Sequence, residues 1–497
     1  MASLIRFRNR SELSGRFRQH IKNNINKEKE KDVSEQSNAS VRPFGMRDKI
    51  GYALGDCGND FTFMLSSVLL LKFYTDVMGV SAALVSAMMM GCKFVDAVTD
   101  VTMGQIVDRS EPAAGGKFIP WMRRFMGPVA VASFLLYATW FRDMSTGFKI
   151  AWMFFTYILW GSVCYTGVNI PYGSMASALT DNPHERTLLS TYRNMGATLA
   201  NMTISVVLPL VVYYYDENGN QVLSGTKVTI AAAVCSVLAV ICYLLCTSMC
   251  TERVKIEKKT EKFRISELGK QLFSSRATLS IIVIALLLLL SMMTMTTMAG
   301  YVFPNYFNKA AGQSIASLCG TLLSFFLALV VIPPVTKKFG KKELAIVGNI
   351  VAAIAYFVLF FIHTENMAVY IIGFLLGYFG IGCFNGVIWA MIVDVIDADE
   401  VKRGTRSDGT IYSLYSFARK LGQALAAGLS GVILTAVGYT TETAFDKAVT
   451  DGIYNGSTLI PAIGFVLVFV LLIVWYPLDK KTVDANAAEL AARRGKQ

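Results

Sequence analysis

The residues of this chain best suited to chemistry are two aspartates, Asp96 and Asp100, within a long apolar stretch. A carboxylate at the centre of a membrane helix costs about 3 kcal/mol on insertion scales, so it usually has a partner or a function. Residues four apart share a helix face, so both acids point the same way, with Thr99 beside Asp100. The pattern predicts a site for a small cation or a proton.

The chemistry of this acid pair does not distinguish Na⁺ from H⁺ as the bound ion. Two close carboxylates cannot both ionise cheaply without a counter-charge. Their oxygens and the Thr99 hydroxyl are ligands that a partly dehydrated Na⁺ accepts, and the same acids could share one proton. A structural ion pair with Lys93 or Lys420 is the alternative interpretation.

Composition indicates that the acids are carried by a membrane protein. Of the 497 residues, 54% are hydrophobic and 16% are charged, whereas a soluble domain carries about 25% charged residues. Apolar stretches of roughly 20 residues, enough to span a bilayer, recur along the chain. We therefore expect an all-α membrane protein with twelve transmembrane helices, near 50–76, 81–107, 119–141, 148–178, 186–214, 227–250, 277–306, 313–335, 343–363, 367–396, 408–437 and 456–476.

The placement of the charges predicts the orientation in the membrane. The net charge is +12, and Lys and Arg collect in the two tails and in alternate loops. The positive-inside rule then puts both termini in the cytoplasm, for a multi-pass protein of the inner cell membrane. The basic excess thus reflects topology and attraction to anionic lipid, with no indication of nucleic-acid binding.

The chain also divides into two similar halves. Each half has a short basic loop containing glycine after its second span, at 104–124 and at 333–343. Such internal similarity predicts two six-helix bundles around one central cavity, with the binding site near the bilayer midplane. The expected domains are a disordered cytoplasmic basic tail (1–45), an N-terminal bundle (46–250), a cytoplasmic middle loop (251–276), a C-terminal bundle (277–478) and a cytoplasmic tail (479–497).

Several motifs carry a resemblance to known transporters. Gly104, Asp108 and Arg109 are similar to the loop signature of the major facilitator superfamily, which implies gating loops at the inner face. The motifs GYALGDCGNDF, FYTDVMGVS, VDAVTDVTMGQIVD, CYTGVNIPYGS and YSLYSFARKLGQ resemble those of the glycoside–pentoside–hexuronide:cation symporters. The resemblance covers roughly 46–478 and lies nearer the glucuronide carriers than the melibiose permease.

The resemblance implies roles in cation binding. In this family the positions of Asp96 and Asp100 hold the coupling ion, and Thr166 matches a contributing residue. Thr99 stands where the melibiose permease has asparagine, which keeps both Na⁺ and H⁺ possible. Lys420 matches the positive charge that the family places near the acids, where it would compete with the cation.

The resemblance also implies a sugar site. Asp60 matches the family's sugar-binding acid and Arg193 its sugar-site arginine, whose planar fork suits ring hydroxyls or a uronate. If Arg193 does not face substrate, we expect it to pair with Asp60. The other candidate substrate residues lie on three further spans and beside Asp60, and for the aromatic ones simple packing is the alternative: Asn59, Tyr165, Asn169, Gly173, Tyr301 and Trp389.

The substrate class follows from the substitutions in this site. Asn169 replaces an aspartate and Gly173 a tryptophan of the melibiose permease, which makes the site less negative and roomier. Both changes favour a bulkier or anionic glycoside, such as a glucuronide or a xyloside-type sugar. A lysophospholipid or other non-sugar cation symporter is one alternative, and a membrane sugar sensor or scaffold that does not transport is another.

Motifs of other classes do not occur in the sequence. There is no G-x-x-x-x-G-K-[ST] loop and no nucleophile–histidine–acid or HExxH arrangement, so no enzyme activity is expected. The sequence predicts a secondary active transporter that couples a Na⁺ or H⁺ gradient to glycoside symport. Its expected partners are the sugar, the coupling cation and the lipid bilayer, without a further cofactor, and we expect a monomer.

Overall fold

The computed structural model describes residues 42–113, 115–254, 275–404 and 408–494. The predicted disordered tail (1–45) and the middle loop (251–276) therefore lie almost entirely outside the described residues. Every long element is a helix. Within the described residues, nine helices are long and apolar enough to cross a membrane, judged by length and composition alone.

The first half contains six helical spans and a short hairpin. Its elements are α2 (Met46–Lys72) with η1 (Phe73–Val77), α3 (Ala82–Arg109), α4 (Ile119–Leu135), η2 (Thr139–Phe141), α5 (Thr146–Tyr157) continuing through η3 (Ile158–Tyr165) into α6 (Thr166–Leu179), α7 (Pro183–Val211), β1 (Tyr213–Tyr215), β2 (Gln221–Leu223) and α8 (Gly225–Met249). β1 and β2 pair antiparallel, with Tyr213 opposite Leu223.

The second half repeats this organisation without the hairpin. Its elements are α10 (Arg276–Tyr301) with η4 (Val302–Tyr306), α11 (Ala311–Phe326) continuing through η5 (Leu327–Val331) into α12 (Ile332–Lys338), α13 (Lys341–Ile362), α14 (Met367–Asn385) followed by α15 (Ile388–Arg403), α16 (Asp408–Ala436), α17 (Lys447–Val474) and α18 (Lys480–Arg494). The helical segments follow the predicted spans, which confirms the all-α membrane fold.

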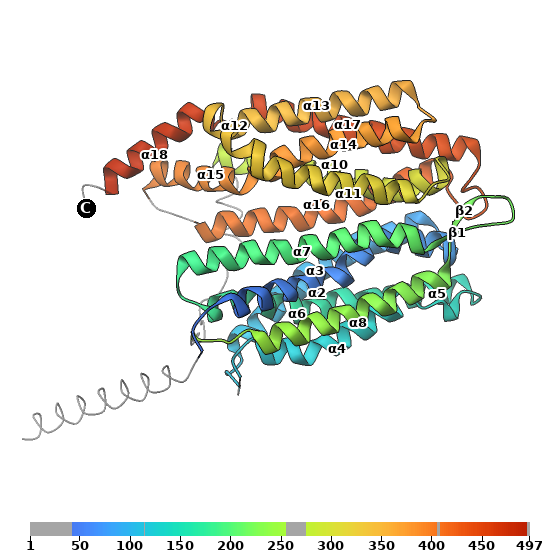
Figure 1. Ribbon diagram of the computed structural model, residues 1–497, viewed down its shortest axis with the longest axis horizontal. Helices are drawn as coiled ribbons and strands as arrows, with labels where there is room; N and C mark the ends of the chain where they lie inside the picture. Colours follow the sequence, from blue (N-terminus) through green and yellow to red (C-terminus); the bar gives the residue numbers. More distant parts are fainter. Residues whose placement is uncertain (1–41, 114, 255–274, 405–407, 495–497) are drawn as a thin grey trace, which may run out of the picture.

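The two halves lie side by side (Figure 1). The helices α7 and α16 run along the middle of the view, with α13, α14 and α17 on one side and α4 and α8 on the other. The hairpin marks one end of the molecule, hereafter the hairpin end. The start of α2 and the C-terminal helix α18 mark the opposite end, hereafter the terminal end.

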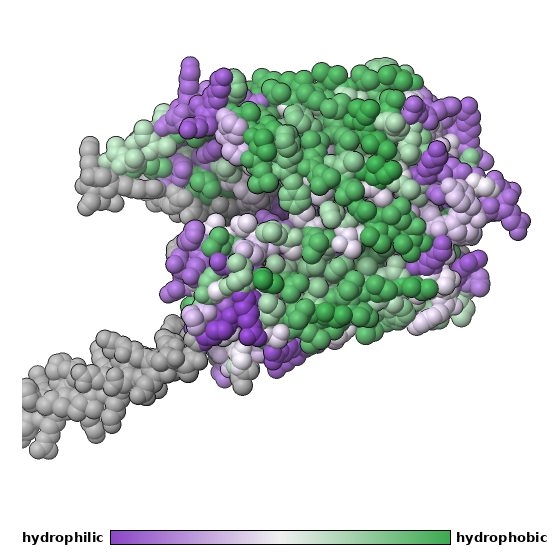
Figure 2. Space-filling view, in the orientation of Figure 1, coloured by the Kyte–Doolittle hydropathy of each residue, from purple (hydrophilic) through white to green (hydrophobic). Residues whose placement is uncertain are grey.

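The outer surface has the apolar character that lipid contact requires. Large side chains such as Leu329 and Phe361 are 77% and 78% exposed, and apolar residues cover a broad band of the face in Figure 2, between polar ends. A soluble monomer seldom exposes so large an apolar patch. The band therefore indicates the lipid-facing surface.

Small residues let the helices approach closely at two contacts. An added Cβ at Gly58 of α2 would lie 3.0 Å from the Tyr243 ring and 3.1 Å from the Ala239 carbonyl oxygen of α8. Across the halves, an added Cβ at Gly431 of α16 would lie 2.9 Å from the Ala82 carbonyl oxygen of α3. Close packing of small residues is a common means of helix association in membranes. The contact between α3 and α16 positions the central charges described next.

Candidate functional site

Asp96 lies at the centre of the first half, where α3 faces η3. Its Oδ1 accepts a 2.6 Å hydrogen bond from the Ser162 hydroxyl, and its Oδ2 lies 3.3 Å from the Lys93 ammonium nitrogen. The side chains of Asp96 and Lys93 are 13% and 18% exposed, so this pair is largely desolvated. Asp96 is thus neutralised from within its own helix.

Asp100 connects the two halves of the protein. Its Oδ1 accepts a 2.8 Å hydrogen bond from the Thr166 hydroxyl of α6. Its Oδ2 forms an ion pair with the ammonium group of Lys420, which belongs to α16 of the second half. Thr166 and Lys420, both predicted for this site, therefore contact the same carboxylate, that of Asp100.

Thr99 has a different partner from the one expected. Its hydroxyl donates to the backbone carbonyl of Asp96, at 3.1 Å, instead of facing the two carboxylates. In the described part of the chain, no three His, Cys, Asp or Glu side chains are grouped so that they could hold a metal ion. Each acid has a lysine as its counter-charge, as in the ion-pair interpretation of the sequence.

The arginine of the predicted sugar site pairs with an unexpected acid. The Arg193 Nε lies 3.2 Å from Oδ1 of Asp56, and its guanidinium lies 5.5 Å from the centre of the Tyr172 ring. The alternative pairing of Arg193 with Asp60 was wrong, because both acids share a face of α2 and the first one is in reach. Among the described residues, Asp60 has no hydrogen-bond or ion-pair partner.

The remaining first-half candidates form a wall beside Asp60. The Asn59 amide donates to Oδ1 of Asn169 at 3.4 Å and accepts a 2.8 Å bond from Tyr243. Tyr165 stacks on Phe63, with ring centres 5.9 Å apart. Gly173 is exposed, and no atom lies within 4 Å of where its Cβ would be.

The two second-half aromatic residues, Trp389 and Tyr301, have different surroundings. Trp389 is 47% exposed and meets the Tyr415 ring edge-on at 4.9 Å. Tyr301 is 1% exposed, and the Lys72 ammonium lies 4.3 Å above the centre of its ring. Tyr301 therefore has no free face for a sugar in this conformation.

A buried charge cluster near the hairpin end joins the two halves. The Lys72 ammonium lies 3.0 Å from Asp76 and donates to Oδ1 of Asn305 at 2.7 Å. The Tyr439 hydroxyl donates to Asp76 at 2.8 Å. Lys72 and Asp76 come from the first half, and Asn305 and Tyr439 from the second. We call these four residues the outer cluster.

The hairpin adds a second connection at the same end. The backbone N–H of Gln221 donates to Oδ1 of Asn308 at 2.6 Å, and the Asn308 amide donates to the Gly219 carbonyl at 2.7 Å. The Gln221 side chain also accepts from the backbone N–H of Ala310. Figure 2 shows a deep notch between the halves at the opposite, terminal end. The halves are therefore joined at the hairpin end and parted at the terminal end.

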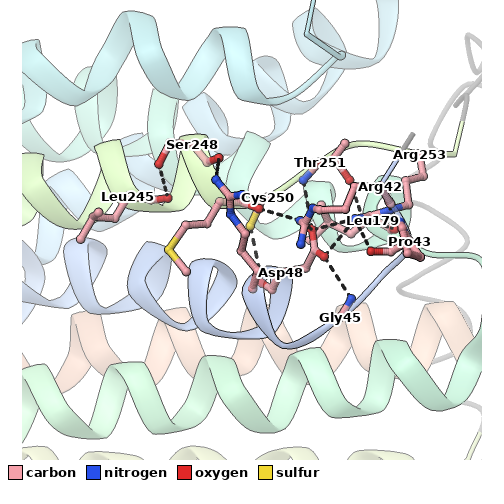
Figure 3. Close-up of polar contacts among 12 residues, drawn as sticks. Arg42, Pro43, Gly45, Asp48, Leu179, Leu245, Ser248, Cys250, Thr251 and Arg253 are labelled. Atoms are coloured by element: carbon pink, nitrogen blue, oxygen red, sulfur yellow. Dashed lines mark hydrogen bonds and ion pairs between the residues drawn. The ribbon is translucent and has the colours of Figure 1, made fainter. Parts of the chain in front are cut away.

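Asp48 organises the terminal end of the first half (Figure 3). This carboxylate is fully buried and accepts from Arg42 at 2.8 Å and from Arg253 at 2.9 Å. It also accepts from the backbone N–H of Thr251. The chain before α2 is thus tied to the chain after α8.

The predicted gating loop is anchored by a neighbouring acid. Glu252 accepts from the backbone N–H groups of Lys117, Phe118 and Ile119, all at 2.7–2.8 Å, at the start of α4. An acid at a helix N-terminus is favourable because it meets unsatisfied N–H groups. The Lys117 ammonium donates to the Asp108 carbonyl at 3.0 Å. Nearby, Arg109 is exposed and the Cβ position of Gly104 is 4.0 Å from Ile170.

A central cavity of about 220 Å³ lies between the two halves. Lys93 is its one charged lining residue among those described. The cavity has a first-half wall with Phe63, Tyr157, Trp160, Asn201 and Ser205, and a second-half wall with Met292, Thr297, Gln313, Ser317, Phe374, Tyr378 and Gln423. Lys93 thus touches both this cavity and the Asp96 carboxylate.

Sequence reasoning missed most of the second-half wall and the partners of the acids. Ser162, Gln313 and Gln423 are ordinary polar residues within apolar spans, and no spacing distinguishes them. The outer cluster had a weak signal, since Lys72 and Asp76 stand four residues apart with opposite charge. Because Lys72 and Asp76 lie near the end of the first predicted span, contact with the membrane–water interface was an equally reasonable explanation of their charges.

Comparisons with known proteins agree with this architecture. Residues 51–480 match the family model described as MFS/sugar transport protein. The isoprimeverose transporter of Lactiplantibacillus pentosus is 31% identical over 435 residues, covering 87% of this chain and 89% of that protein. The glucuronide carrier protein homolog of Escherichia coli (strain K12) is 28% identical, covering 90% and 96%.

A solved structure supports the fold. The crystal structure of the nucleoside transporter NupG superposes with a TM-score of 0.59 at 13% identity, covering 87% of this chain and 100% of that one. At this identity the likeness concerns the fold alone. The family match spans nearly the whole membrane region, both bundles included. The chain therefore belongs to the MFS/sugar transport family, the glycoside–pentoside–hexuronide:cation symporters of the major facilitator superfamily.

Proposed function

We propose that the protein is a secondary active transporter that carries a glycoside together with Na⁺ or H⁺ by alternating access. The observation that carries the proposal is the ion pair between Asp100 of α3 and Lys420 of α16. This ion pair joins the two halves, and a coupling ion bound at Asp100 would take the place of the Lys420 ammonium. Membership of a sugar symporter family supports the same conclusion.

The charge pairs support a physical account of coupling. In the ion-free state, Lys93 neutralises Asp96 and Lys420 neutralises Asp100. A cation bound between the acids competes with the lysines, and the released Lys420 no longer holds α16 against α3. Because binding free energies are reciprocal, a sugar that favours the same rearrangement raises the affinity for the cation by an equal factor.

The substrate we propose is a glucuronide- or xyloside-type sugar. Asp60 has a carboxylate without a partner among the described residues, and Arg193 presents a guanidinium beside it on a neighbouring helix. Such a pair can accept from ring hydroxyls and donate to a ring oxygen or a uronate. Relatives named for isoprimeverose and for glucuronide support this class.

We also propose an orientation for the observed conformation. Basic residues collect at the terminal end: Lys337 and Lys338 end α12 beside Lys480 of α18, Arg253 contacts Asp48, and Arg109 ends α3. By the positive-inside rule this end faces the cytoplasm, so both described chain ends would be cytoplasmic. The notch would then open inward and the outer cluster would close the external side. We propose that a monomer carries out the cycle.

Transport can be tested by counterflow in vesicles that contain the purified protein. Labelled glucuronides, xylosides, other glycosides and a lysophospholipid would be offered against unlabelled internal ligand. We expect counterflow with at least one glucuronide or xyloside. Saturable uptake of the lipid alone would support the non-sugar symporter instead, and sugar binding without counterflow would support a sensor.

The coupling ion has a direct test at fixed pH. Uphill uptake should cease when the coupling gradient is removed, because that gradient supplies the free energy for accumulation. Loss on replacing Na⁺ by K⁺ identifies sodium, whereas loss only on collapsing the pH gradient identifies protons. Uptake that survives both treatments would contradict cation coupling.

Arg193 should affect sugar binding more than cation binding. Arg193→Lys keeps a positive charge for Asp56 but loses the planar donor fork, so we expect sugar affinity to fall by about tenfold. The affinity for the coupling ion should change much less. The matched control is Arg123→Lys, since the Arg123 guanidinium donates to the Thr247 carbonyl near the terminal end. A larger loss of cation affinity than of sugar affinity would remove Arg193 from the sugar site.

A further inference from the structure

Gln313 of α11 is a buried amide whose hydrogen-bonding groups are unused. Its residue is 6% exposed, and its side chain lines the central cavity. Among the described residues, the side-chain amide has no hydrogen-bond partner, although its backbone N–H bonds to Ala310. Because the amide opens into the cavity, its donor and acceptor groups are available to a molecule bound there.

Other polar side chains of the second half line the same cavity. Thr297 of α10, Ser317 of α11 and Gln423 of α16 also face it, and their side chains have no hydrogen-bond partner in the described part of the chain. By contrast, the Asn201 amide oxygen on the first-half wall already accepts from Ser205, at 3.0 Å. The Trp160 indole N–H on the first-half wall also lacks a partner among the described residues. Unused polar groups therefore line both walls, and the second-half wall contributes two amides and two hydroxyls.

The rest of this wall suits the face of a sugar ring. Phe374 and Tyr378 of α14 and Met292 of α10 supply apolar surface beside the polar groups. Aromatic rings and amides together are the usual lining of small-molecule sites. No carboxylate lines the cavity among the described residues, and its one charge, Lys93, is paired with Asp96. An uncharged, hydroxylated group therefore matches the cavity best.

The size of the cavity limits what it can hold. Sites that enclose a whole drug-sized ligand measure roughly 300–1,000 Å³, whereas this cavity measures about 220 Å³. The cavity begins one helical turn beyond Asp60, at Phe63 and Met64 of α2. A ligand bound at Asp60 and Arg193 could therefore place only one more small group, about the size of a single ring, in this cavity.

We propose that this cavity is a neutral subsite for the second ring of the transported glycoside, and that Gln313 selects substrates that carry it. This inference rests on the proposed function, with the first ring at Asp60 and Arg193. The Gln313 amide donates to one ring hydroxyl and accepts from another, while Phe374 and Tyr378 cover the ring face. Two-ring substrates are then preferred over the corresponding single ring.

The test compares Gln313→Leu with wild-type protein in detergent, using calorimetric binding of paired probes. One pair is a glucuronyl disaccharide with methyl glucuronide, and the other is a xylosyl disaccharide with methyl xyloside. We expect Gln313→Leu to bind its disaccharide roughly tenfold more weakly, because a site built for hydroxyls loses its partner. Binding of the methyl glycoside should change by no more than about twofold, since distant contacts add independently.

Two further variants keep the test interpretable. Asn349→Leu removes another buried second-half amide, which bonds within α13 to Ala345, and it should change neither affinity. Thr297→Val removes a cavity hydroxyl at constant shape. Like Gln313→Leu, it should weaken binding of the disaccharide. It therefore replaces Gln313→Leu if that variant does not fold.

The possible results separate this inference from the proposed function. Unchanged disaccharide affinity in both cavity variants, or equal losses for disaccharide and methyl glycoside, would overturn the subsite. Binding with the expected pattern but without counterflow in vesicles would overturn transport and leave the subsite standing. Failure of the wild-type protein to bind either probe pair would contradict both.

Discussion

Replacing Asp100 with asparagine should abolish uphill accumulation, so that the ratio of internal to external substrate falls to about one. The substitution keeps the shape of the side chain and its bond with Thr166 but removes the charge that Lys420 and the coupling ion share. Without that charge the ion has nothing to compete for. Downhill exchange should suffer less than accumulation. Uptake in vesicles with and without an imposed ion gradient measures both quantities.

Two variants control this experiment. Asp451→Asn changes an acid of α17 that lies 3.2 Å from His363, the C-cap residue of α13, and it should leave accumulation intact. Asp100→Asn combined with Lys420→Gln removes both partners, which is usually less harmful to the fold than leaving one buried charge alone. The double variant should insert normally yet still fail to accumulate substrate. Normal accumulation by either Asp100 variant would refute the cation site.

The fold could be predicted because hydrophobic length and charge placement are properties of single segments. Each span needs only about 20 apolar residues, whatever its neighbours are. The length of the 367–396 span predicts a tilted or broken helix. The position of the break, between Asn385 of α14 and Ile388 of α15, could not be predicted because the apolar run continues through it. The segments η1, η3, η4 and η5 are short π-helical stretches within the spans, and the sequence did not predict them for the same reason.

The partners of the charged residues were less predictable than the charges themselves. Asp96 and Asp100 stand out because a carboxylate in an apolar run is costly. The choice of Asp56 over Asp60 for Arg193 depends on the relative rotation of α2 and α7, which no local pattern encodes. Likewise, Gln313 becomes notable only when packing shows its amide buried in a cavity without a partner. A residue's surroundings, and not its type, carry this information.

The outer cluster leads to the second large effect. Asp76→Asn should open the hairpin end, because it leaves the Lys72 ammonium buried without its counter-charge. The two side chains are 9% and 3% exposed, and removing one partner of a buried ion pair costs about 3–5 kcal/mol. Because 1.4 kcal/mol is a tenfold change in an equilibrium constant, the balance between closed and open hairpin ends should shift by about a hundredfold or more. Hydrogen exchange of the backbone amides in η1 and η4 would report the opening.

The cost should be smaller when both charges are removed together. In Asp76→Asn with Lys72→Met, neither partner leaves a buried charge, so exchange in η1 and η4 should return most of the way to the wild-type rate. This non-additivity is the expected signature of two residues in direct contact. Tyr439→Phe removes one hydrogen bond to Asp76 and should have an effect nearer tenfold than a hundredfold. If Asp76→Asn, Lys72→Met and the double variant all exchange at the wild-type rate, the cluster does not hold the hairpin end closed. If their effects are simply additive, the ion pair is not what holds it closed.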